Sequence, residues 1–167
     1  MKARTLITFK LRLRHKRQSF LKLLRRLDRK PPRGLQKIAV NAAAEVWDHV
    51  DCLSCANCCK VMTPTYTNAD IKRIAAHLEM SEKDFKTQWL KKERGTGEWI
   101  NKSTPCQFLD GKTNLCSIYD VRPADCAGFP HLTKKRVVDY LHVHIQNIDE
   151  CPATFKMVER MEEMLGK

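Results

Sequence analysis

Apolar residues near the N-terminus recur at the spacing of an α-helix. Phe20, Leu23, Leu24 and Leu27 lie three or four positions apart, and lysines and arginines fill many of the positions between them. This alternation predicts a basic amphipathic helix over about residues 18–29.

A second amphipathic pattern starts after Pro31 and Pro32. These prolines are expected to end the first helix, because proline removes a backbone donor and restricts the residue before it. Apolar residues then recur at helical spacing, which predicts a long helix that leads directly into the first cysteines. The members of this stripe are Leu35, Ile38, Ala39, Ala42, Ala43, Val46, Trp47 and Val50.

Two shorter helices are predicted from capping signals. Thr67 and Asp70 have the spacing of a capping box, in which two side chains and two backbone amides bond reciprocally. Ser81 and Asp84 repeat this spacing before a second apolar stretch that begins at Phe85.

Short strands are predicted in two places. Residues 98–101 follow a glycine-containing turn, and residues 136–145 are rich in β-branched side chains that partly alternate with polar ones. On the second strand His142 and His144 would share one face, as in some metal sites and, more often, on solvated faces.

The chain ends in another predicted helix. Cys151 precedes Pro152, and proline is favoured at the first position of a helix. Cys151 would therefore lie at a helix N-terminus, where the helix dipole favours the thiolate. All the predicted elements together indicate a small, mostly α fold with short strands and long loops (α+β).

Basic residues are concentrated in the first fifth of the chain. The net charge is +12 at pH 7, and residues 1–35 carry all of it with a single acid, Asp28. The rest of the chain balances to zero. We therefore predict a basic amphipathic arm over residues 1–34 and a cysteine-cluster metal-binding domain over residues 35–167.

The basic arm has two interpretations. Residues 1–30 suit an anionic partner, such as RNA, the ribosome or an acidic membrane surface. Alternatively, the leucines of the arm dock on the domain and its charges are simply solvated.

The sequence also bears on cellular location. It contains no run of about 18 to 20 apolar residues, so no integral membrane segment is expected. It also lacks the uninterrupted apolar region of a secretory signal, and a cytoplasmic protein is predicted. In a eukaryote, the acid-poor residues 1–27 would also fit a mitochondrial presequence.

Eight cysteines carry the candidate chemistry, and four of them fall within eight residues as C-x-x-C-x-x-C-C. A C-x-x-C step turns two thiolates toward one metal, so this pattern predicts metal binding. Disulfides fit poorly, because adjacent Cys58 and Cys59 would pair only as a strained ring. The predicted ligands are Cys52, Cys55, Cys58, Cys59, Cys106, Cys116, Cys126 and Cys151.

The cofactor is predicted to be an iron–sulfur cluster or zinc. Zinc suits four thiolates in a closed tetrahedral site. Iron–sulfur clusters accept the same sulfurs at wider spacing, which the repeated C-x-x-C step slightly favours. His131 shares a loop with Cys126 and is a candidate ligand, or a donor to one.

These motifs resemble a known family. The C-x-x-C-x-x-C-C run, Pro105-Cys106-x-Phe-Leu and Cys116-x-Ile-Tyr119-x-x-Arg122-Pro-x-x-Cys126 together are similar to the zinc- or iron-chelating CxxCxxCC domains, also called the YkgJ-type cysteine-cluster family. The resemblance covers about residues 51–152 and implies zinc or iron binding, with Tyr119 and Arg122 close to the ligands. Family members often carry arginine where this chain has Ala127, so no role is carried over for that arginine.

Three classes of function follow from these observations. The first is a metal-binding cysteine-cluster protein. The second is a metal-dependent enzyme or enzyme subunit, because flagellin lysine N-methylases carry a similar cysteine cluster. The third is an RNA- or ribosome-associated module that uses the basic arm. The sequence holds no P-loop, G-x-G-x-x-G or H-E-x-x-H motif to support the second class.

Overall fold

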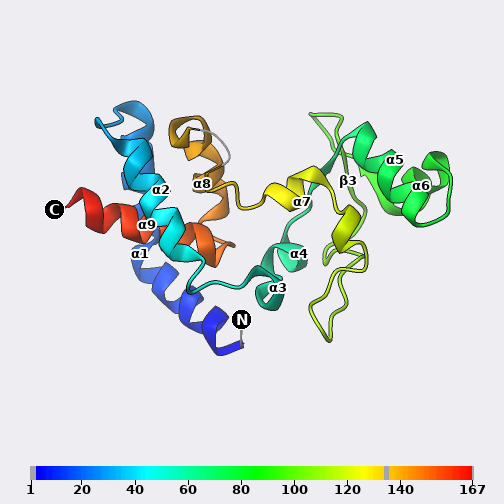
Figure 1. The fold of residues 1–167 in the computed structure, drawn as a ribbon, viewed down its shortest axis with the longest axis horizontal. Coiled ribbons are helices and arrows are strands. Elements are labelled where there is room, and N and C mark those ends of the chain that lie inside the picture. The colour runs from blue at the N-terminus through cyan, green and yellow to red at the C-terminus, as the bar shows by residue number, and fades with distance from the viewer. Residues whose placement is uncertain (1–2, 134–135, 167) are drawn as a thin grey trace. The chain divides into compact units, whose positions relative to one another are not determined.

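The computed structural model describes residues 3–133 and 136–166 (Figure 1). The chain forms two compact units. The terminal unit comprises residues 1–55 and 130–167, and the central unit comprises residues 56–129.

The described part of the terminal unit is helical. The long helices α1 and α2 pack against α9, and α1 also packs against α8 (Figure 1). Its elements are α1 (Ala3–Arg29), α2 (Leu35–Val46), α3 (Cys52–Cys55), the 3-10 helix η2 (Val137–Tyr140), α8 (Leu141–Asn147) and α9 (Pro152–Leu165). The first helix therefore begins at Ala3 rather than near residue 18, and the second ends at Val46 rather than Val50.

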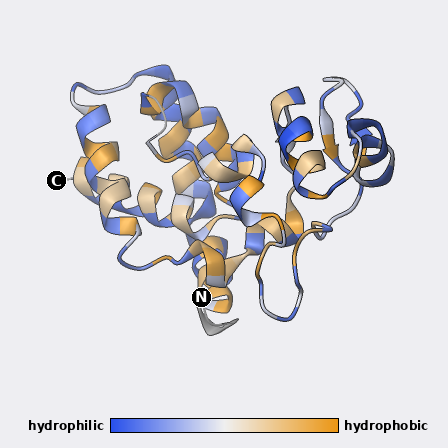
Figure 2. Cartoon of the chain, turned by 45° about the vertical axis from the view of Figure 1, so that its right-hand side comes forward, coloured by the Kyte–Doolittle hydropathy of each residue, from blue (hydrophilic) through white to orange (hydrophobic). Residues whose placement is uncertain are grey.

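Helix α1 is docked through its apolar stripe. Phe20, Leu24 and Leu27 are at most 1% exposed, and the ring of Phe155 on α9 lies 5.1 Å from that of Phe20 and 5.5 Å from that of Phe9. Figure 2 shows hydrophobic and hydrophilic residues alternating along the helices, as expected when one side is buried. Separability of residues 1–34 stays a prediction.

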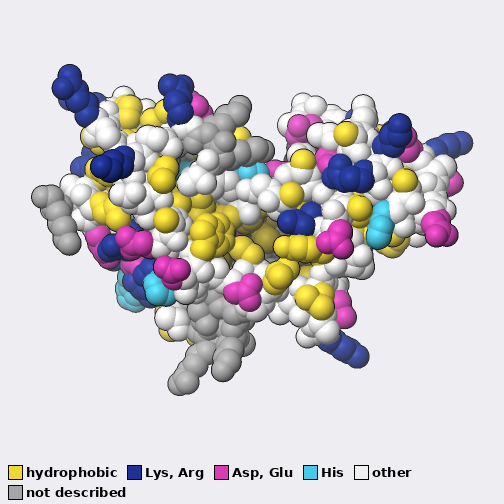
Figure 3. Space-filling model, in the orientation of Figure 1, with side chains coloured by type: hydrophobic (Ala, Val, Ile, Leu, Met, Phe, Trp, Pro, Cys, Tyr) yellow, Lys and Arg dark blue, Asp and Glu magenta, His cyan; other side chains and the backbone are white. Residues whose placement is uncertain are grey.

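Ion pairs border this apolar contact. Arg17 makes a two-pronged bond to Asp149 at 2.7 and 2.8 Å, and Lys16 lies 3.0 Å from Glu162. Arg12 bonds to Glu159, a carboxylate that is buried at α9. Basic and acidic side chains lie next to one another at several points on the face drawn in Figure 3.

The strand predicted over residues 136–145 is wrong. The described residues there form η2 and α8, so His142 and His144 do not share a strand face. His144 is fully buried, whereas His142 is exposed. Packing explains the difference, because Leu141 and His144, three residues apart, point into the unit together and override the β-propensity of the valines.

The central unit combines helices with a small antiparallel sheet of order β1-β3-β2. Ile100 on β3 pairs with Thr65 on β1 and with Lys91 on β2. The elements are α4 (Asn57–Val61), β1 (Thr65–Tyr66), α5 (Asn68–His77), α6 (Glu82–Trp89), β2 (Leu90–Lys92), β3 (Trp99–Asn101), the 3-10 helix η1 (Tyr119–Val121) and α7 (Ala124–Gly128). The described elements thus confirm a mostly α fold with short strands.

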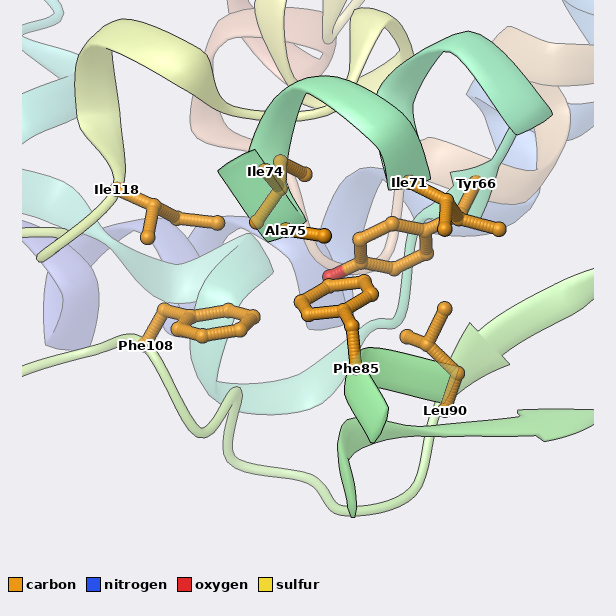
Figure 4. Packing of buried hydrophobic residues seen from close by; sticks show 8 residues of the cluster. All are labelled: Tyr66, Ile71, Ile74, Ala75, Phe85, Leu90, Phe108 and Ile118. Atoms are coloured by element: carbon orange, nitrogen blue, oxygen red, sulfur yellow. The ribbon is translucent and has the colours of Figure 1, made fainter. Parts of the chain in front are cut away.

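Aromatic side chains form the core of the central unit (Figure 4). The rings of Phe85 and Phe108 are stacked with centroids 6.3 Å apart, and Tyr66 lies 6.2 Å from Phe85 on the other side. Ile71 and Ile74 of α5 are fully buried in the same cluster. Phe108 belongs to a loop between two cysteines, so this core also fixes the loop that carries them.

Both predicted caps are confirmed. The hydroxyl of Thr67 accepts a bond from the Asp70 amide, and the Asp70 carboxylate accepts one from the Thr67 amide. The hydroxyl of Ser81 accepts a bond from the Asp84 amide and so caps the N-terminus of α6. Among the helices of the described residues, none is both long and apolar enough to cross a membrane.

The docking of α1 yields a stability prediction. Leu24→Ala removes a fully buried side chain from the contact with α8 and α9, and it is expected to lower the free energy of unfolding by about 2–5 kcal/mol. Leu11→Ala, on the exposed side of the same helix, is the control and should change this free energy by less than about 0.5 kcal/mol. Denaturant unfolding of both variants measures the difference. Equal, small effects would show that α1 is not held by its leucines.

The burial of His144 yields a pH prediction. Burial, together with the nearby His131 and His142, lowers the pKa of His144 from 6.5 to about 4. Neither of its ring nitrogens has a hydrogen-bond partner among the described residues. The unfolded chain therefore binds the proton first as the pH falls, and stability is lost between about pH 6.5 and pH 4, by up to about 3 kcal/mol.

The matched pair His144→Leu and His142→Leu tests this dependence. Denaturant unfolding at several pH values should show a flatter profile below pH 6.5 for the first variant and a much smaller change for the second, because His142 is exposed and only adds to the effect of burial on His144. An unchanged slope in both variants would assign the acid sensitivity to other groups.

Candidate metal centre

Four thiols of the central unit lie within electrostatic reach of one another. Cys59 is on α4, Cys106 and Cys116 are on the loop that follows β3, and Cys126 is on α7. The charges of Cys59, Cys106 and Cys116 all raise the pKa of Cys126, and Cys59 and Cys106 raise that of Cys116. We call Cys59, Cys106, Cys116 and Cys126 the central thiol set.

Backbone hydrogen bonds bring two members of this set together. The amide of Cys106 donates to the carbonyl of Cys59 at 2.8 Å, which ties the motif to a loop more than forty residues later. Between Cys106 and Cys116 the chain turns at Asp110, whose carboxylate accepts bonds from the Lys112 and Thr113 amides. This turn returns Cys116 to the backbone opposite Leu109.

A buried carboxylate positions the segment that carries Cys126. One oxygen of Asp70 accepts bonds from the Ala124 amide at 3.0 Å and from Arg73 at 2.7 Å. Arg73 also donates to the carbonyl of Arg122. Burial alone would raise the pKa of Asp70, but hydrogen bonds from Thr67, Arg73 and Ala124 outweigh it and lower the pKa.

Burial works against ionisation of most of the central thiols. It is the largest cause of the raised pKa values of Cys106, Cys116 and Cys126. Cys59 differs, because the hydrogen bond from Cys58 lowers its pKa to about 7, and the two sulfurs are 3.9 Å apart. Cys59 is therefore the member of the set that ionises most readily.

Two polar side chains favour the thiolate form at individual positions. Burial raises the pKa values of Cys106 and Cys116, and a hydrogen bond from the side chain of Asn101 at Cys106 and the charge of Arg122 at Cys116 offset part of this rise. Asn101 is held by Tyr66, whose hydroxyl donates to its amide oxygen at 2.6 Å. Its buried amide nitrogen has no standard hydrogen-bond partner among the described residues, which leaves that donor available for a sulfur anion.

Three further cysteines belong to the terminal unit. Cys55 and Cys151 are buried, and Cys52 is exposed. Burial raises the pKa of Cys151, and the charge of Cys55 raises it further. These two thiols are therefore also electrostatically coupled. Cys151 is the N-cap residue of α9 with Pro152 next in the chain, as predicted.

Ala56 separates the two halves of the C-x-x-C-x-x-C-C motif. It has a φ of 45°, in the left-handed region that costs a residue with a side chain about 1–2 kcal/mol. In a continuous helix Cys52, Cys55 and Cys59 would lie on one face, but the reversal at Ala56 divides the motif into α3 and α4.

All eight cysteines are free thiols. No disulfide joins any of the eight cysteines, all of which lie in the described ranges. Among those residues, no three histidine, cysteine, aspartate or glutamate side chains are arranged to hold one metal ion. Thiolates are donors that both zinc and iron–sulfur clusters use, so the chemistry of the central thiol set fits either.

The other predicted site residues fall in different places. The guanidinium of Arg122 stacks on the ring of Tyr119 at 3.8 Å and donates to its carbonyl, so both belong to the turn between Cys116 and Cys126. His131 belongs to the terminal unit, where its ring lies 5.8 Å from that of Tyr140. The sequence did not indicate Asn101 or Asp70 as supports of the thiols, because no local signal marks a partner so distant in the chain.

The similarity of this chain to known proteins agrees with its cysteine pattern. The profile of the CxxCxxCC family, described as "Putative zinc- or iron-chelating domain", matches residues 51–152. An uncharacterized protein of Methanocaldococcus jannaschii is 34% identical over 86 residues, which cover 51% of this chain and 46% of that relative. This chain thus matches less than half of that relative's length. No solved structure matches.

The lowered pKa of Cys59 yields a reactivity prediction. In metal-free protein at pH 7, iodoacetamide should modify Cys59 on the order of tenfold faster than Cys116 or Cys126, because the thiolate is the nucleophile. Cys58→Ala removes the hydrogen bond and should slow modification of Cys59, whereas Cys116→Ala is the control. Mass spectrometry of timed samples gives the rates. Similar rates at all three cysteines would contradict the assignment.

Proposed function

Because this chain belongs to the family of zinc- or iron-chelating CxxCxxCC domains over residues 51–152, we propose that its central thiol set binds a zinc ion or an iron–sulfur cluster. The family match supports metal binding, and the grouping of the thiols supports the choice of ligands. Cys59, Cys106, Cys116 and Cys126 supply four sulfurs, the number that a closed zinc site or a four-thiolate cluster uses.

The observation that carries this proposal is the grouping of four partly buried thiols from three separate segments of the central unit. Burial is the largest cause that opposes ionisation of Cys106, Cys116 and Cys126, and the charges of neighbouring sulfurs add to it. A bound cation reverses the balance, because a thiol that coordinates a metal is deprotonated outright. A cluster of half-buried thiols is therefore expected to be stable in ionised form only around a positive charge.

The neighbouring side chains take defined roles in this proposal. Asn101 donates to the sulfur of Cys106, and Arg122 offsets negative charge at Cys116. In this proposal Cys58, whose sulfur lies 3.9 Å from that of Cys59, donates a hydrogen bond to the Cys59 thiolate rather than serving as a fifth ligand. Bound zinc would hold the loops in place, and an iron–sulfur cluster would add one-electron redox chemistry.

The thiols of the terminal unit form a separate candidate set in this proposal. Cys52 and Cys55 lie one turn apart on α3, and Cys55 and Cys151 are electrostatically coupled. Asp51 bonds the Leu53 amide at 3.0 Å and so helps to fix the short α3 helix. Three sulfurs leave a fourth metal position for another donor.

Metal analysis tests the proposed function. Full-length protein purified without oxygen is expected to hold at least one zinc or iron per chain, and an iron–sulfur cluster would also show visible absorption. Cys126→Ser should reduce the metal content, because it removes one sulfur of the central thiol set. Ser117→Ala, next to Cys116 and exposed, is the control and should leave it unchanged.

Two results would contradict this proposal. One is wild-type protein that is folded and free of metal after preparation with zinc and iron supplied. The other is equal metal content in Cys126→Ser and Ser117→Ala, which would move the site away from the central thiol set.

A further inference from the structure

The cations of α1 fall into two groups with different surroundings. Arg12, Lys16 and Arg17 bond to acids of the C-terminal region, namely Glu159, Glu162 and Asp149. A second group is exposed and has no acidic partner among the described residues. Besides Lys10 and Arg14, it contains Lys22, Arg25, Arg26 and Arg29, and we call these last four the outer basic stripe.

Helical geometry places the outer basic stripe on one side of α1. Its members are spaced i, i+3, i+4 and i+7, so they lie along one face over about 10 Å. The buried residues Leu23, Leu24 and Leu27 occupy the opposite face. Docking of α1 therefore fixes four positive charges in a row toward solvent, without ordering them by ion pairs of their own.

We propose that the outer basic stripe binds the phosphate backbone of a nucleic acid. Three of its four side chains are arginines, whose planar guanidinium pairs with phosphate oxygens through two parallel bonds. Lys30 and Arg33 follow directly and are exposed, which continues the positive charge beyond the helix. The only acid in residues 1–35 is Asp28, so little negative charge opposes the approach of phosphates.

The surroundings of the stripe favour nucleic acid over a membrane surface. An interfacial helix inserts its apolar face into the lipid, but the leucines of α1 are used for docking within the terminal unit. The large exposed apolar residues of α1 are Ile7 and Leu11, and Leu11 is about 16 Å along the helix from Lys22. The outer basic stripe thus carries positive charge but contains no apolar side chain that could insert into lipid.

The salt dependence of binding provides the first test. Fluorescence anisotropy with labelled 20-base-pair RNA and DNA duplexes should show an affinity that falls about 100-fold between 50 and 200 mM salt, as expected for about four phosphate contacts. Phosphatidylserine vesicles are the comparison. Binding to vesicles but not to either duplex would overturn the proposal in favour of a membrane surface.

A matched pair of double variants separates the stripe from net charge. Arg25→Gln with Arg29→Gln removes two charges from the stripe, and it should weaken duplex binding at least tenfold and reduce the salt slope by about 2. Lys16→Gln with Arg17→Gln removes the same net charge from the paired group. This control should bind within about twofold of wild type, with a lower melting temperature. Equal losses in both would overturn the proposal.

Protection of lysines in the wild-type chain tests the surface without any substitution. Acetylation of Lys22 should slow at least severalfold when the duplex is added, whereas exposed Lys72 on α5 should react as before. Unchanged acetylation of Lys22 under binding conditions would exclude the stripe as the contact. These readouts do not depend on metal content, so they stand or fall separately from the proposed thiol site.

Discussion

The central unit has to hold four partly buried thiols near one another, where burial and neighbouring charge disfavour the thiolate form of most of them. These thiols belong to the short helices α4 and α7 and to the loop between them that follows β3, and charges on Cys59 and Cys106 disfavour a charge on Cys116 and Cys126. The surrounding structure holds them near one another nonetheless, through the Cys106–Cys59 backbone bond and the Asp70 carboxylate. The aromatic core around Phe108 fixes the loop from the other side. These contacts offset the entropy that is lost when the loops close, before any cation is bound.

The terminal unit accommodates the strongly basic helix α1 by separating its apolar residues from its charges. Its apolar stripe is buried against α8 and α9, and acids of the C-terminal region neutralise the cations nearest to that contact. The cations farthest from it are left in solvent. The helical periodicity of α1 therefore accounts for both features. It places the apolar residues on the buried side of the helix and the unpaired cations on the exposed side.

The sequence predicted those features that depend on neighbouring residues. The caps at Thr67 and Ser81, the N-terminal position of Cys151 and the short strand at Trp99–Asn101 all rest on local signals. Residues 136–145 were predicted wrongly because burial of Leu141 and His144 selects a helix that their neighbours do not favour. The division of the cysteines between two units also escaped prediction, because it depends on contacts between residues that are far apart in the chain, such as Cys59 and Cys106.

The order in which these elements are synthesised determines when each unit can fold. The central unit is one continuous stretch, so all of its contacts can form while the rest of the chain is still being made. Helix α1 is made well before α8 and α9, on which it packs. At about 5–20 residues per second, its leucines wait on the order of ten seconds for their partners. During that interval a newly made chain exposes an apolar stripe flanked by arginines, and chaperones that hold such segments would act on it.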